Sequence, residues 1–252
     1  MSGHNKWSTI KHKKGAADAK RGKIFSRLAK ELTVIAKQGG GDPDMNPSLR
    51  TIIAKAKAVN MPADNIDRAI KKGTGEIAGN VLEELIYEGY AAGGVGLIVI
   101  ALTDNKNRAA AEIRHIFNKQ GSSFATQGSV SRGFERKGQF FIEAEGVDED
   151  QLMDVVLEAG AEDMVRDGEQ FEVLTEPGAF VAVNDALTAA GVTPLSGEVT
   201  LIPLTPVPVS EKTVAASVMR FVDVLEDNDD VQNVYTNMDV DDAIMAELSE
   251  EG

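Results

Sequence analysis

Apolar positions in the first 75 residues recur at the spacing of an α-helix. Between Ala16 and Lys37 they fall on one face, and the basic residues fall on nearly the opposite one. Gly39-Gly40-Gly41 ends this helix, and Asn46-Pro47 begins a second one with an N-cap residue and a proline in the first turn. Met61-Pro62 interrupts the chain again, and a third, shorter helix ends at Gly73. The pattern predicts a bundle of three amphipathic helices.

After residue 79 the spacing changes to that of strands. We expect strands over 82–90 and 97–103, joined by a glycine-rich turn, and a helix over 108–120. The polar, turn-rich stretch 121–133 is interpreted as a loop or linker. The next segments follow the order strand, helix, strand, strand, helix, strand, which is typical of a ferredoxin-like domain. They cover 139–144, 149–159, 163–166, 170–175, 179–190 and 198–203.

A last helix over 211–225 and a last strand over 231–236 follow a proline-rich connection. One helix and one strand cannot bury their own apolar faces, so they must dock on another part of the chain. The two-stranded unit at 80–120 lacks further strands and is the natural receiver. The sequence therefore predicts an α+β protein of three domains with a frayed acidic end. The expected parts are a basic helical nucleic-acid-binding domain (1–75), a discontinuous α/β domain (76–131 plus 206–240), an inserted ferredoxin-like βαββαβ domain (132–205) and an acidic tail (241–252).

The charge is distributed very unevenly along the chain. The net charge of the whole chain is −14, yet residues 1–75 hold 16 Lys and Arg against 6 Asp and Glu, a net charge of +10. The remaining residues hold 10 basic and 34 acidic side chains, a net charge of −24. Such asymmetry indicates a polyanion partner for the basic part.

Composition also excludes several classes of protein. There is no cysteine, which excludes disulfides, thiolate metal sites and cysteine nucleophiles and fits a reducing cytoplasm. No apolar run approaches the roughly 18 residues that span a bilayer. The basic amino terminus has no apolar stretch behind it, unlike a secretory signal. We expect a cytoplasmic protein without a membrane partner.

The basic side chains of the helical domain are the candidate phosphate ligands. Binding through them predicts a salt dependence with a slope of about −0.9 per phosphate contact on duplex DNA. The alternative is a solvated helix face, but the density of charge on one side favours a polyanion. Trp7 and His12 are able to stack on RNA bases. The candidates are Lys6, Trp7, Lys11, His12, Lys13, Lys14, Lys20, Arg21, Lys23, Arg27, Lys30, Lys55, Lys57, Arg68, Lys71 and Lys72, and a possible second contact is Arg132, Arg136 and Lys137.

Other chemistry has little support in the sequence. Gly93-Gly94-Val95-Gly96 lacks the residues of a phosphate-binding loop and is interpreted as a turn. The three histidines lie far apart, so neither a metal site nor a base for a hydroxyl nucleophile is indicated. Acidic clusters such as Glu226-Asp227 with Asp229-Asp230 lack calcium-loop spacing and are interpreted as solvated caps and turns. We expect a non-enzyme with no cofactor, no metal and no small-molecule substrate, whose acidic domains suit contacts with basic proteins.

Several blocks of the sequence closely resemble the YebC/PmpR family. They are Gly3-His4-Asn5-Lys6-Trp7, Lys11-His12-Lys13-Lys14, Asp18 to Phe25, Asn46-Pro47 with Leu49-Arg50, Lys55-Ala56-Lys57, Asn60-Met61-Pro62, Asn65-Ile66, Arg68 to Gly73, Tyr87 to Tyr90, Thr103-Asp104-Asn105, Asn107-Arg108 and Gly128-Ser129-Val130. The likeness runs over nearly the whole chain. It departs from the family at 121–127 and at Ser131-Arg132-Gly133, which leaves the role of this loop open.

The resemblance implies a three-domain cytoplasmic protein that is a DNA-binding transcriptional regulator. The family is also similar to mitochondrial translational activators, and ribosome-associated roles, including relief of stalling at proline-rich sequences, are attributed to members. The alternative is therefore a translation factor that binds ribosomal RNA or tRNA through the same basic surface. Charge does not separate the two, because DNA and RNA both present phosphates. Sequence-specific reading is not supported, since neither a zinc finger nor a convincing helix-turn-helix is found.

Overall fold

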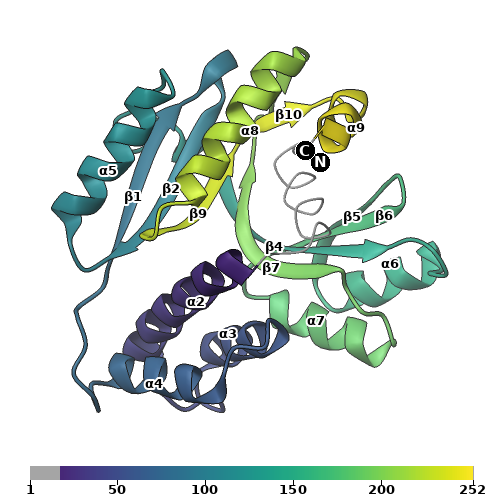
Figure 1. The fold of residues 1–252 in the computed structure, drawn as a ribbon. Coiled ribbons are helices and arrows are strands. Elements are labelled where there is room, and N and C mark those ends of the chain that lie inside the picture. Colours follow the sequence, from purple (N-terminus) through teal and green to yellow (C-terminus); the bar gives the residue numbers. More distant parts are fainter. Residues whose placement is uncertain (1–17, 252) are drawn as a thin grey trace. The chain divides into compact units, whose positions relative to one another are not determined.

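A computed structural model describes residues 18–251 of the chain (Figure 1). The residues form two compact units. One comprises residues up to 127 together with 216–234, and the other comprises 128–215 together with 235–251. The α+β fold class that the sequence predicts is confirmed, whereas the predicted domain boundaries stay a prediction.

The first unit begins with three helices, α2 (Asp18–Gly39), α3 (Pro47–Ala58) and α4 (Ala63–Thr74), which we call the helical module (Figure 1). Their apolar faces enclose one core, as the helical spacing of the sequence predicts. Leu32, Leu49 and Ala56 are completely buried in it. The helical module therefore has a hydrophobic core of its own.

Gly73 allows α2 and α4 to pack closely. A Cβ atom at this position would meet the carbonyl oxygen of Thr33 and would lie 2.8 Å from the Cβ atom of Ala36. The sequence predicts that α4 ends at Gly73, and this is wrong by one residue. The helix continues to Thr74, and Gly75 caps it with a φ of 82°, a conformation that favours glycine. Gly73 is needed for the close approach of two helices, not for the end of one.

Asn46 joins the end of α2 to the start of α3. Its side chain is buried, its Oδ1 accepts a hydrogen bond from the backbone N–H of Leu49 at 3.1 Å, and its Nδ2 donates to the carbonyl of Gly40 at 2.9 Å. The side chain thus acts as the N-cap that the sequence predicts. It also satisfies a carbonyl in the loop that follows α2.

Replacing Asn46 with alanine is expected to lower the free energy of unfolding by about 2 kcal/mol, because both an N-cap and a buried hydrogen bond are lost. Thermal unfolding followed by circular dichroism measures the change. Asn46→Asp keeps the cap acceptor and loses the Nδ2 donor, so we expect it to fall between the wild type and Asn46→Ala. Equal stability of the wild type and Asn46→Ala would contradict this role.

The rest of the first unit is a four-stranded sheet with helices packed on it. Its strand order is β3-β1-β2-β9. β1 and β2 form an antiparallel hairpin with Glu83 opposite Thr103, joined through the short helix η1 (Ala92–Gly94). Because β9 pairs beside β2, the tail strand completes this sheet as the sequence predicts. The elements are β1 (Glu83–Tyr90), β2 (Gly96–Thr103), α5 (Lys106–Lys119), β3 (Ser123–Phe124), α8 (Lys212–Glu226) and β9 (Val231–Thr236).

The segment 121–133 is more regular than the predicted loop. It contains the strand β3, which pairs with the end of β1, and the short helix η2 (Ser131–Gly133). The ring of Phe124 stacks on that of Phe117 with a centroid distance of 4.4 Å. This aromatic contact fixes the segment on the sheet, and the interpretation of the whole segment as a loop is therefore wrong.

The second unit contains a four-stranded antiparallel sheet with the order β5-β6-β4-β7, which is the ferredoxin-like arrangement. Two helices, α6 and α7, cover one face (Figure 1) and bury Phe140 and Phe171 against it. β4 begins at Phe134, five residues before the predicted start, because its polar first half pairs with β7. The elements are β4 (Phe134–Glu143), α6 (Glu149–Glu158), β5 (Ala161–Asp167), β6 (Gln170–Thr175), α7 (Phe180–Ala189) and β7 (Ser196–Pro203).

The chain is helical near its carboxyl-terminal end, up to Glu251. Two short parallel strands, β8 (Val207–Val209) and β10 (Met238–Val240), lead into α9 (Asp242–Glu251). Met245 of α9 is buried, and Lys212 forms an ion pair of 3.0 Å with Glu247. The expectation of a frayed tail is wrong, because these contacts hold the helix to the second unit.

Candidate nucleic-acid interface

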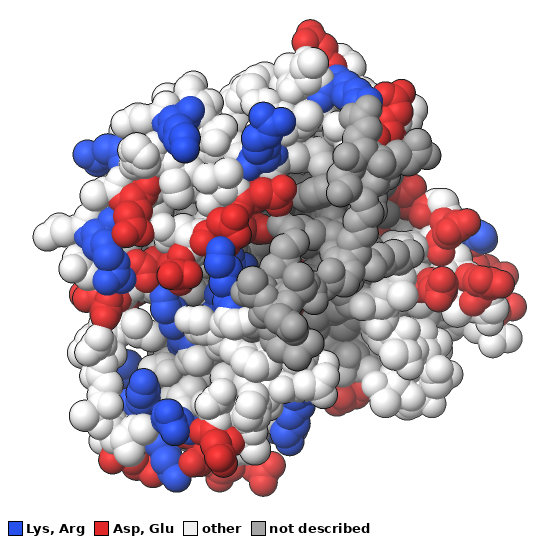
Figure 2. Space-filling model, in the orientation of Figure 1, with Lys and Arg blue, Asp and Glu red and all other residues white. Residues whose placement is uncertain are grey.

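Three basic residues of α2 face an acidic turn of the chain. Lys23, Arg27 and Lys30 are spaced so that they share one face of the helix. Residues 226–230, between α8 and β9, form what we call the acidic turn. Lys23 Nζ donates to the Asp227 carboxylate at 2.9 Å, and Arg27 donates to the backbone carbonyl of Glu226. In Figure 2, basic and acidic atoms accordingly lie side by side where this turn meets α2.

Asp230 is the centre of this contact. Its side chain is 5% exposed and accepts hydrogen bonds from Lys30 Nζ at 2.9 Å, Arg108 Nη2 at 2.9 Å and Thr103 Oγ1 at 3.0 Å. Lys30 also donates to the carbonyls of Leu102 and Asp229, at 3.0 and 2.8 Å. One carboxylate therefore joins the helical module to the end of β2 and the start of α5. The interpretation of this acidic cluster as solvated turns is wrong at Asp230.

The partners of Asp230 keep it ionised. Burial alone raises the pKa of this carboxyl, but hydrogen bonds from Arg108, Lys30 and Thr103 outweigh burial, and the pKa lies below its usual range. Arg108 is held in turn by Asp104 at 3.1 Å. The charges around Asp230 are therefore compensated within the protein. Thr103, Asp104 and Arg108 lie in the blocks that carry the family resemblance, but the sequence alone does not indicate this role for them.

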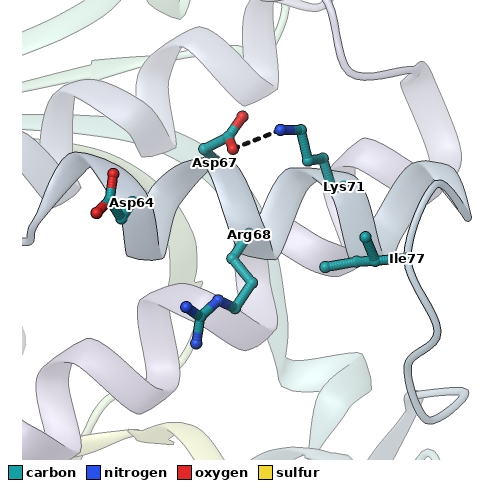
Figure 3. Close-up of a pocket in the computed structure, with 5 residues that line it drawn as sticks. All are labelled: Asp64, Asp67, Arg68, Lys71 and Ile77. Atoms are coloured by element: carbon teal, nitrogen blue, oxygen red, sulfur yellow. Dashed lines mark ion pairs between the residues drawn. The ribbon is translucent and has the colours of Figure 1, made fainter.

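The basic residues of α4 lie in a different environment. Lys71 pairs with Asp67 at 2.7 Å, and the pKa of Lys71 is raised by this hydrogen bond and ion pair (Figure 3). Arg68 extends from the opposite side of the helix. Arg68 and Lys72 are exposed, and the structure of residues 18–251 shows no ion pair or hydrogen bond to either side chain. Lys55 and Lys57 of α3 are exposed as well.

The remaining candidates divide into two groups. Lys6, Trp7, Lys11, His12, Lys13 and Lys14 lie outside the described residues, and so do the side chains of Lys20 and Arg21. At the possible second contact, Arg132 and Arg136 are exposed, but Lys137 is only 13% exposed. Its ammonium group lies 2.8 Å from Glu162 and 2.5 Å from Glu176, and these hydrogen bonds raise its pKa. The positive charge of Lys137 is therefore compensated by two carboxylates of the same unit.

A cleft of about 1240 Å³ lies between α2, α4 and the acidic turn, within the first unit. One wall comes from α2 and α4, and the other from the start of α5 and the acidic turn. A smaller hollow of about 290 Å³ lies against Asp64, Asp67, Arg68, Lys71 and Ile77 (Figure 3). The cleft is not apparent from the sequence, because the residues of α2 that line it are about 200 residues from the acidic turn along the chain.

The described residues contain no helix that is long and apolar enough to cross a membrane. Among the same residues, no three His, Cys, Asp or Glu side chains are gathered in a way that would hold a metal ion.

Comparison with known proteins identifies the family. Residues 5–76 match the model of the TACO1/YebC protein N-terminal domain, and residues 82–238 match that of the TACO1/YebC second and third domain. The chain belongs to the TACO1/YebC family. The resemblance that the sequence showed is thereby confirmed.

Relatives in the TACO1/YebC family share more than half of their sequence with this chain. A protein of Desulfotalea psychrophila is 53% identical over 99% of this chain and 100% of its own length. A protein of Geobacter sulfurreducens is 54% identical over 98% of this chain and 100% of its own length. Both are named "Probable transcriptional regulatory protein". The names support a regulatory factor.

A solved structure resembles the fold as well. This is the crystal structure of a conserved hypothetical protein from Aquifex aeolicus, whose sequence is 43% identical to this chain. The match covers 89% of this chain and 93% of that protein's chain, with a TM-score of 0.79. The α+β arrangement described above is thus shared with a solved relative.

Proposed function

We propose that this protein is a cytoplasmic, DNA-binding transcriptional regulator that contacts phosphate groups through its helical module. The observation that carries the proposal is the net charge of +10 on residues 1–75 in a chain whose net charge is −14. Exposed cations without a partner among residues 18–251, such as Arg68 and Lys72, provide the contacts. The names of the relatives support a role in transcription.

The distribution of charge also limits where nucleic acid docks. The net charge of −24 on the residues after 75 repels phosphates, so docking is confined to the helical module and local basic positions. Phosphate contacts hold a protein on the duplex without reading its sequence. We therefore expect strong dependence on salt and weak dependence on DNA sequence.

Binding to duplex DNA is expected to persist at about 150 mM salt and to weaken with a log–log slope of about −0.9 for each phosphate neutralised. Fluorescence anisotropy of labelled duplex DNA over a series of salt concentrations measures this slope. Structured RNA and purified ribosomes compete in parallel samples. Loss of duplex binding at this salt while ribosome binding persists would replace the transcriptional role by the translational one, in which the same surface binds ribosomal RNA or tRNA.

A further inference from the structure

One face of α4 presents three polar side chains to the cleft. Asn65, Arg68 and Lys72 are spaced at positions i, i+3 and i+7, so they lie on the same side of the helix. All three are exposed and line the cleft of about 1240 Å³. We call them the α4 face. Figure 2 shows basic side chains gathered over α4, beside acidic ones.

The other cations of the cleft are already engaged. Lys23 and Lys30 of α2 also line it, but both are bound by the acidic turn at 2.9 Å. Arg108 is bound by Asp104 and Asp230. To reach a phosphate, each would have to give up a carboxylate. Arg68 and Lys72 have no such contact within the described chain, so among the described residues that line the cleft the available positive charge lies on α4.

The opposite wall sets the direction in which a ligand lies. Glu112 and Asp229 line the cleft there, and phosphate groups are repelled from them. Asp67 is not an obstacle on the α4 side, because it pairs with Lys71 on the other side of the helix from Arg68 (Figure 3). A polyanion in the cleft therefore places its phosphates toward α4.

We propose that the α4 face is a contact site for the phosphodiester backbone of nucleic acid, with Arg68 and Lys72 as the charged ligands and Asn65 as an amide donor. The guanidinium group of Arg68 binds two phosphate oxygens with its planar fork, and Lys72 adds a point charge. Amide side chains such as that of Asn65 are common donors to phosphate oxygens. This inference rests on the proposed function and assigns it a location, one that does not include Lys23, Arg27 and Lys30 of α2.

The test is a pair of double variants with the same change of charge. Arg68→Glu/Lys72→Glu removes the site, whereas Lys37→Glu/Lys119→Glu reverses two exposed lysines outside the cleft lining and serves as the control. We expect the first variant to bind duplex DNA at least about ten-fold more weakly and to reduce the magnitude of the salt slope by about 2, since two phosphate contacts are lost. The control is expected to keep the wild-type slope.

A neutral variant and a second ligand make the result decisive. Arg68→Gln/Lys72→Gln is expected to reduce the slope by a similar amount, and circular dichroism checks that each variant is folded. Structured RNA is measured beside the duplex, and loss for RNA alone would assign the site to RNA. Equal losses in the cleft and control variants, with binding by the wild type intact, would overturn the α4 site but leave the proposed function standing. Failure of the wild type to bind any nucleic acid would instead reject the proposed function itself.

Discussion

Replacing Asp230 with alanine is expected to lower the free energy of unfolding by about 3 kcal/mol, because removal of one partner leaves buried charge uncompensated. Lys30, whose side chain is 19% exposed, would lose its carboxylate and remain against the carbonyls of Leu102 and Asp229. Thr103 would lose its acceptor. For a chain of this size the change corresponds to a fall in Tm of about 6–12 °C.

Neighbouring residues of the acidic turn provide the controls for Asp230. Asp227→Ala removes an exposed ion pair with Lys23, and such pairs contribute about 0–1 kcal/mol. Asp229→Ala makes the same change of charge at an exposed side chain. Hydrogen exchange measured by mass spectrometry should locate the effect of Asp230→Ala in α2 and β9 rather than in α6 and α7. If the three variants unfold at the same temperature, Asp230 has no special role in joining the module to the sheet.

The same carboxylate predicts how stability depends on pH. The pKa of Asp230 is lower in the folded protein than the usual aspartate value of 3.8. Its contribution is therefore present above about pH 4 and is lost as the pH falls through the folded pKa. The stability difference between wild type and Asp230→Asn should shrink over this acidic range. A difference that stays constant down to pH 2 would show that the ionised form of Asp230 is not what stabilises the contact between the helical module and the sheet.

The main elements follow from patterns that are local in the sequence. The apolar residues of the helical module are spaced for helices, and Leu32 and Leu49 are buried as that spacing predicts. The place of β9 follows from a different argument, since a single strand and a single helix have to find a partner sheet. The ferredoxin-like order could likewise be predicted from alternating segments and their turns.

The elements that were missed depend on contacts between distant residues. β3, β8 and β10 are two or three residues long, and each exists because a partner strand lies beside it. The placement of α9 depends on the burial of Met245 and on the ion pair between Lys212 and Glu247, within an acidic sequence. Local propensity carries little information about such segments.

The sequence also does not predict which basic residues of the candidate site are free to bind phosphate. The sequence predicts a basic face on α2, and it does not show that Lys23, Arg27 and Lys30 meet an acidic turn about 200 residues further along the chain. The one-sided spacing alone fits a phosphate surface and an internal ionic contact equally well. What separates Arg68 and Lys72 from the α2 cations is tertiary structure.

The second large effect is expected at Phe117, which is completely buried in the core of the first unit. Its ring stacks on Phe124 and meets the edge of Phe221 at a centroid distance of 4.9 Å. Gly89 of β1 lies directly against the same ring, and a Cβ atom there would collide with it. One aromatic side chain thus holds α5, α8 and the β1–β3 pairing together.

Phe117→Ala is expected to lower the free energy of unfolding by about 4 kcal/mol, since the lost burial is joined by the cost of a cavity. Because β3 pairs with β1 over just two residues, its amides should lose protection from hydrogen exchange first. Phe117→Leu refills part of the volume and should recover more than half of the loss, and His115→Ala, on the exposed face of the same helix, should change stability little. Destabilisation by His115→Ala as large as that by Phe117→Ala would show that the helix, and not the aromatic cluster, determines the effect.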